Sequence, residues 1–123
     1  MTPQEIFNKS YLAVVEQGRP SVNKEGMCAY RGKGSRKCAI GHLIDDATAK
    51  RWDKYETAGI HDVSRKARIK PDWLDSNLAL LVSIQRAHDI AFWKEGEDFV
   101  EEYKQSMSYI AKKYRLTVPE LSS

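Results

Sequence analysis

The sequence predicts a single, mostly helical α+β domain with about four helices and one short β-hairpin. Apolar residues recur at helical spacing in four segments, and a glycine-rich turn separates two short apolar runs. The chain has 123 residues, 41% of them hydrophobic, and a chain of this size buries roughly two thirds of its unfolded surface. We therefore expect residues 1–123 to form one globular domain, with a tail from about residue 117.

The first predicted helix has clear start and stop signals. Thr2 and Glu5 form a capping box around Pro3, which suits the first helical position. Gly18 supplies a left-handed stop, and Pro20 prevents continuation. The apolar stripe between these signals consists of Phe7, Tyr11, Val14 and Val15.

Residues 26–31 and 36–40 flank a Gly-Lys-Gly-Ser turn and predict a β-hairpin, because glycine tolerates the positive φ angles of such turns. With the turn centred on its lysine and second glycine, Cys28 and Cys38 are expected to lie near each other across the strands. A two-stranded hairpin is marginal alone, so it should pack against the helices.

Three further helices follow in the prediction. Helical spacing indicates one from about residue 39 to about 51, and then a less regular stretch to residue 71 with room for one short helix. Asp72 or Asp75 can cap a long helix that ends near Phe92. The last predicted helix carries an apolar stripe made of Phe99, Tyr103, Met107, Ile110 and Tyr114.

Composition excludes several classes of protein. No apolar run approaches the roughly 18 residues of a membrane span, and the first ten residues lack the pattern of a secretory signal. Two cysteines cannot form a disulfide framework and indicate a reducing cytosol. We therefore expect a cytoplasmic protein without a membrane partner. The formal net charge of +3 does not by itself announce nucleic-acid binding.

Basic residues gather at the predicted hairpin tip, where glycines expose backbone amides. They could grip phosphates or an acidic protein surface; the alternative is a solvated loop, which is the commoner role of a charge run. The candidate partner-binding residues are Arg31, Lys33, Arg36 and Lys37.

Cysteines and histidines offer a second kind of site. Cys28, Cys38, His42 and His88 make up a Cys2His2 set that a tetrahedral zinc ion could use. Their spacing differs from that of familiar zinc modules, in which paired ligands stand two to four residues apart. The alternative is that both cysteines are small core residues under the hairpin.

A thiol hydrolase is the other form of this hypothesis. Cys38 would lie at a helix start beside basic residues that lower a thiol pKa, with His88 and Asp89 as base and orienting group. His88 also lies on the apolar stripe of its helix, where a hydrogen-bonded core histidine is the commoner finding.

Two segments resemble a family of small bacteriophage and prophage proteins. The first, residues 26–46, contains Cys-Ala-Tyr-Arg-Gly and Lys-Cys-Ala-Ile-Gly; a later His-Asp pair and residues 110–116 (Ile-Ala-Lys-Lys-Tyr-Arg-Leu) complete the pattern. The resemblance implies an accessory protein that acts in a bacterial cytosol, but it carries no activity, cofactor or site. Proteins of this origin often bind a host macromolecule, for example to inhibit a defence system.

The leading hypothesis is therefore a non-enzymatic protein that binds a host protein or nucleic acid through its basic hairpin and needs no cofactor. The alternative is the cysteine–histidine site, either zinc-binding or hydrolytic.

Overall fold

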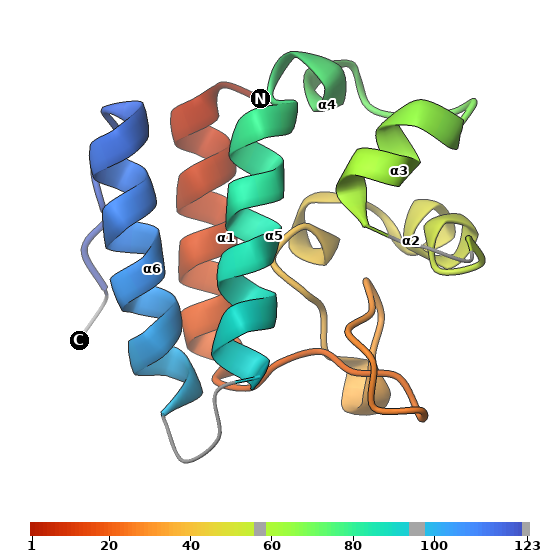
Figure 1. The fold of residues 1–123 in the computed structure, drawn as a ribbon, viewed down its shortest axis with the longest axis horizontal. Helices are drawn as coiled ribbons and strands as arrows, with labels where there is room; N and C mark the ends of the chain where they lie inside the picture. The colour runs from red at the N-terminus through yellow and green to blue at the C-terminus, as the bar shows by residue number, and fades with distance from the viewer. Residues whose placement is uncertain (56–58, 94–97, 122–123) are drawn as a thin grey trace.

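The computed structural model describes residues 1–55, 59–93 and 98–121, and every regular element within them is a helix. The long helices are α1 (Pro3–Gln17), α5 (Leu78–Trp93) and α6 (Phe99–Tyr114). They contact one another side by side, and α6 runs antiparallel to the other two (Figure 1). The short α-helices are α2 (Asp46–Trp52), α3 (Ile60–Lys66) and α4 (Asp72–Ser76).

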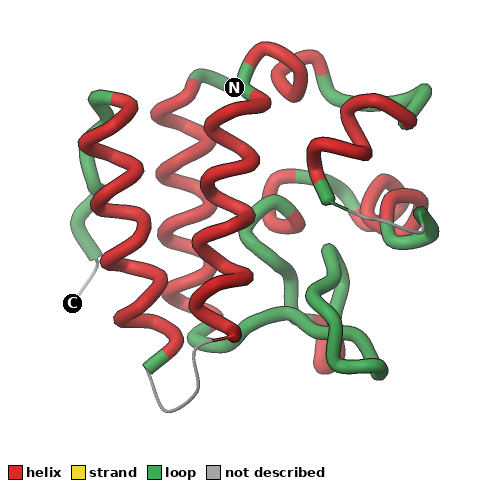
Figure 2. The backbone as a smooth tube through the Cα atoms, in the orientation of Figure 1, coloured by secondary structure: helices red, strands yellow, loops and turns green. Residues whose placement is uncertain are grey.

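The segment between α1 and α2 is a long loop beside α5, with two 3-10 turns, η1 (Lys33–Ser35) and η2 (Gly41–Leu43) (Figure 2). The η2 turn packs on α1, while α3 and α4 pack on α5. The α5 helix therefore has α1 and α6 on one side and the loop with the short helices on the other (Figure 1).

The ends of α1 and α6 follow from local sequence. Thr2 and Glu5 form the predicted capping box, with the Glu5 amide 3.1 Å from the Thr2 hydroxyl, and Gly18 ends α1 at φ 74°. In α6 the Asp98 carboxylate caps the Glu101 amide at 3.1 Å. Both helices are confirmed, and most of each predicted stripe is buried. Ile6, Ser10 and Ala111 are buried in addition, while Val15, Phe99 and Tyr114 are only partly buried.

The predicted β-hairpin is wrong, and so is the α+β fold class that depended on it. No strand occurs in the described residues; two isolated antiparallel bridges remain, Val22 with Cys28 and Arg31 with Lys37. The turn between Arg31 and Lys37 curls into η1, where Gly34 and Ser35 both have positive φ.

The physical reason is that side chains, instead of a partner strand, satisfy much of this backbone. The Asp53 carboxylate accepts the amides of Tyr30 and Arg31 at 3.0 and 3.1 Å. The Gln17 side chain binds both the amide and the carbonyl of Lys37. A chain bound in this way has few backbone groups left for a ladder.

Two predicted helices are each interrupted. Ile44 is extended, so the helix expected from about residue 39 becomes η2 followed by α2, which the Asp45 carboxylate caps at the Thr48 amide. The long helix expected from Asp72 or Asp75 is divided at Asn77 into α4 and α5. The structure therefore has six α-helices among its described residues where about four were expected.

The core joins all these elements. Its largest fully buried side chains include Trp52, Tyr30, Tyr103 and Phe7. Trp52 meets Tyr30 edge to face with ring centroids 5.5 Å apart, and both rings are buried in the core. The loop between α1 and α2 thus contributes to the same core as the long helices.

Candidate functional site

Arg31 is a structural clamp and does not project from a tip. Its Nε pairs with Asp46 at 2.8 Å, while its terminal nitrogens donate to the carbonyls of Tyr30, Gly41 and Ile44. The planar guanidinium suits several acceptors at once. Four hydrogen bonds to the chain itself therefore occupy most of the donors that the prediction assigned to a partner.

The other predicted partner-binding residues have no ion pair among the described residues. Lys33 is exposed, and Arg36 and Lys37 are partly exposed. The loop that carries them is folded against α2 and the end of α1 rather than extended, through the bonds to Asp53 and Gln17.

Lys37 lines an open groove of about 790 Å³ between this loop and α2. Lys50 and Lys54 line the same groove. Its two carboxylates, Asp46 and Asp53, are already bound to Arg31 and to backbone amides. The Arg31 hydrogen bond also keeps the pKa of Asp46 below its usual range. The groove lining therefore carries four basic side chains against two acids, and its three lysines have no ion pair among the described residues.

The structure also brings together a cysteine, a histidine and an aspartate. Ligand atoms of Cys28, His88 and Asp89 lie within 4.8 Å of one another. The hydrolase hypothesis combined Cys38 with His88 and Asp89. The structure places His88 and Asp89 together, but the thiol in this group is Cys28 rather than Cys38. His88 is fully buried, and the side chain of Asp89 is 35% exposed.

Hydrogen bonds determine the state of His88. Its Nε2 accepts the backbone amide of Ser21 at 3.1 Å, and its Nδ1 lies 2.9 Å from the Asp89 carboxylate. Since Nε2 must present a lone pair to the Ser21 amide, the proton of the neutral ring is on Nδ1 and is donated to Asp89. The imidazole has no lone pair left for a metal ion or for a thiol proton.

Both thiols are in environments that keep them protonated. Burial raises the pKa of the Cys38 thiol to about 12, and burial together with the Asp89 charge and hydrogen bond raises the pKa of Cys28. A nucleophilic cysteine needs the opposite, a depressed pKa and a free base within reach. The geometry therefore does not support a thiol hydrolase based on Cys38, His88 and Asp89.

His42 lies apart from this cluster in the η2 turn. Its Nε2 is buried without a hydrogen-bond partner in the described structure, and burial, with Lys37 and Arg31 nearby, lowers its pKa to about 4. His42 belongs to no close group of three metal-ligating side chains in the described residues. The predicted zinc set of Cys28, Cys38, His42 and His88 is thus not assembled as expected.

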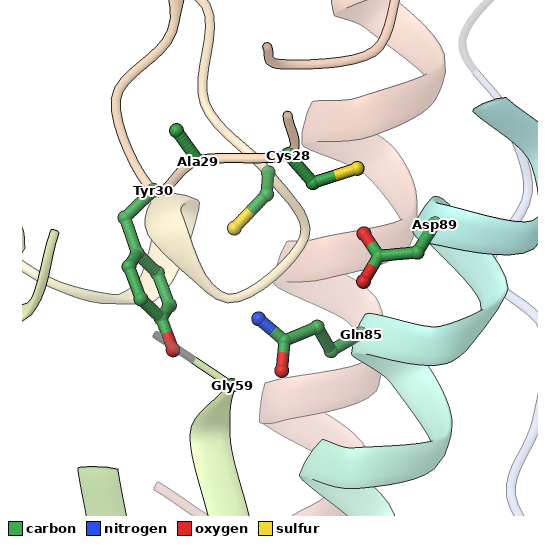
Figure 3. A pocket seen from close by; sticks show the side chains of 7 residues that line it. Cys28, Ala29, Tyr30, Gly59, Gln85 and Asp89 are labelled. Carbon is green, nitrogen blue, oxygen red and sulfur yellow. The ribbon is translucent and has the colours of Figure 1, made fainter. Parts of the chain in front are cut away.

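Cys28 and Cys38 do share one feature, a cavity of about 110 Å³. Figure 3 shows Cys28 directed toward Asp89, with Gln85 beside Asp89 on α5 and the Tyr30 ring opposite. The cavity is lined by Cys28, Ala29, Tyr30, Cys38, Gly59, Gln85 and Asp89.

Sequence reasoning missed the contributions of α2 and α5. Lys50 and Lys54 stand four residues apart, a spacing that places them on one face of a helix and could have indicated a charged strip. No signal in the sequence could have paired Asp89 with Cys28, which is 61 positions away, because that contact depends on how the loop crosses α5.

Among the described residues, no helix is long and apolar enough to cross a membrane. Searches against protein-family models, curated proteins and solved structures found no significant match to this chain.

Proposed function

We propose that this chain is a small phage-type accessory protein that binds nucleic acid of its bacterial host, in the cytoplasm, through the basic groove beside α2. The observation that supports this proposal is the excess of positive charge in the groove lining, where Lys37, Lys50 and Lys54 have no ion pair among the described residues. Lysine ammonium groups are point charges that pair with phosphate oxygens and displace counterions.

The lining of the groove favours a phosphate backbone over a protein partner. Protein interfaces are enriched in aromatic residues and arginine and depleted in lysine. The groove contains no aromatic residue among its described lining, and its arginine is used internally. Without side chains suited to reading base edges, such a groove would hold phosphates with little regard to sequence.

Salt-dependent binding tests this proposal. Fluorescence anisotropy of a labelled duplex of about 20 base pairs, titrated at roughly 50 to 200 mM salt, gives both the affinity and the salt slope. The triple variant K37S/K50S/K54S should bind more weakly and lose about three units of the slope, since each lysine–phosphate contact contributes about one.

The matched control removes the same charge elsewhere. Lys9, Lys112 and Lys113 are exposed on α1 and α6 and do not line the groove, so K9S/K112S/K113S should keep most of the slope. If the wild-type protein does not bind at low salt, or if the control loses as much as the groove variant, the proposal is wrong. If a host protein is captured even after nuclease treatment, and its capture requires the same three lysines, the partner is an acidic protein instead.

A further inference from the structure

The cavity beside Cys28 is lined by one acidic side chain. Asp89 is the charged residue of its described lining, which otherwise consists of neutral side chains and backbone. Burial, with the Asp89 charge as a smaller cause, raises the pKa of Cys28, Tyr30 and Cys38, so these groups stay uncharged around the carboxylate.

No cation neutralises this carboxylate in the described structure. Its partners are neutral donors: the Cys28 thiol forms a hydrogen bond with it, and His88 donates from Nδ1 because the Ser21 amide occupies Nε2. Arg86 lines a neighbouring cavity that shares Gln85 and Asp89, but no ion pair joins it to Asp89. A carboxylate held partly out of water without a counter-charge attracts a cation that can replace the lost solvation.

The size and shape of the cavity restrict which cation fits. A cavity of about 150 Å³ holds benzene, so the cavity of about 110 Å³ suits a group slightly smaller than that ring. A metal ion would need a lone pair from His88 to complete a cysteine–histidine–aspartate site, and the Ser21 hydrogen bond removes it. An organic cation needs only hydrogen-bond acceptors, which the Asp89 carboxylate provides.

We propose that the cavity formed by Cys28, Tyr30, Gln85 and Asp89 binds a primary ammonium group on a short alkyl chain, with the Asp89 carboxylate as its counter-ion. The ammonium donates to Asp89, and the alkyl chain contacts Ala29 and the Tyr30 ring. His88 orients the carboxylate from behind through its Nδ1 proton. This site is separate from the basic groove and does not depend on the proposed nucleic-acid binding.

Amide NMR titration tests the site with n-propylammonium chloride as the probe. Ala29, Tyr30 and Gly59 line the cavity, so their backbone amide signals should shift, with a dissociation constant on the order of 1 mM. The neutral isostere 1-propanol should leave them unchanged at the same concentrations. Blocked lysine amide serves as a second probe; matching shifts would show that a lysine side chain of a partner is a sufficient source of the ammonium group.

Asp89→Asn is the decisive variant, because its amide oxygen can still accept the His88 proton while the charge is gone. It should bind propylammonium at least about tenfold more weakly, whereas Asp72→Asn, at an exposed position on α4, should bind like wild type. A melting curve of Asp89→Asn shows whether the variant folds. If it does not, Asp89→Glu provides the second measurement: the displaced carboxylate should weaken binding while retaining it.

Three results would overturn the proposal. The first is a wild-type titration without shifts at these amides, and the second is equal binding by Asp89→Asn. The third is stoichiometric uptake of Co²⁺ with a thiolate absorption band that Cys28→Ser removes, which would assign the cluster to a metal ion.

Discussion

At the scale of single residues, Arg31 shows how a basic side chain can serve folding rather than recognition. Its guanidinium joins the loop to η2 and to the first turn of α2 through bonds to Gly41, Ile44 and Asp46. The carbonyls of Gly41, the first residue of η2, and of Ile44, just after its end, lack the partners that a continuous helix through this segment would supply. The clamp thus compensates for the break in the helix.

Replacing Arg31 by lysine should destabilise the fold although the charge is kept. A single ammonium cannot satisfy the separate acceptors that the guanidinium reaches, and we expect a loss of about 2–3 kcal/mol in the free energy of unfolding. Urea denaturation measures it. Lys33→Ala, in the same loop but exposed, should change stability by less than about 0.5 kcal/mol; equal effects of the two changes would contradict the clamp.

His42 should make stability depend on pH. Its pKa of about 4 in the folded protein lies below the value near 6.5 of an unfolded chain. The unfolded state therefore takes up a proton first as the pH falls through 6.5, and the stability contributed by the neutral ring decreases until the folded pKa is reached.

Between pH 7 and pH 5 we expect wild type to lose about 1 kcal/mol more stability than His42→Gln, after allowing for solvent screening of a half-buried ring. Thermal denaturation at both pH values provides the comparison. His61→Gln, at an exposed position on α3, should behave like wild type. Identical pH profiles for wild type and His42→Gln would contradict the lowered pKa of His42 in the folded protein.

At the scale of elements, η2 is held unusually close to the loop. A side chain at Gly41 would place its Cβ 2.4 Å from the Tyr30 carbonyl oxygen, and real Cβ contacts do not come so near. The Gly41 carbonyl also accepts from Arg31. The Gly-His-Leu turn can therefore lie against the loop only because its first residue has no side chain.

Gly41→Ala should cost about 3 kcal/mol of stability, because the clash is with backbone that cannot rotate away. Gly59→Ala is the matched control, since a Cβ there meets nothing within 4 Å. Calorimetric melting of both variants measures the contrast. A Gly41→Ala protein as stable as the Gly59→Ala protein would mean that the loop moves freely on η2.

At the scale of the whole molecule, the two thiols report on different depths of the structure. Cys38 is 1% exposed within the main core, and the Gly41 amide donates to its sulfur at 3.3 Å. Cys28 is partly exposed at the cavity. Cys38 lines the cavity with Cys28 but is almost fully buried, so a reagent reaches its sulfur only when the packing around it opens.

Iodoacetamide should modify Cys28 slowly in the native protein and should reach Cys38 only when the chain unfolds. Burial and the protonated state both protect Cys38. Mass spectrometry of the single-cysteine variants Cys28→Ser and Cys38→Ser, with and without urea, separates the two rates. Rapid modification of Cys38 in the native protein would instead show an accessible, reactive thiol, as the thiol hydrolase hypothesis requires.

Local signals determined α1 and α6. Each capping contact and each step along the apolar stripes joins residues only three or four positions apart in the chain. They did not determine the segment between Arg19 and Asp45. Its glycines and short apolar runs are compatible with a hairpin as well as with the observed loop. The difference is made by Asp53 and Gln17, which accept hydrogen bonds from its backbone amides. Those two side chains come from other elements, so only the folded chain shows the competition.

The candidate sites divide in the same way. The sequence by itself identified the basic loop, the two cysteines and the His88–Asp89 pair, because these depend on residue type and short spacing. Only the tertiary structure turned Arg31 inward, added Lys50 and Lys54 to Lys37, and placed Cys28 beside Asp89. The reason is physical: hydrogen-bond partners and charges act over a few ångströms of space, whatever their separation along the chain.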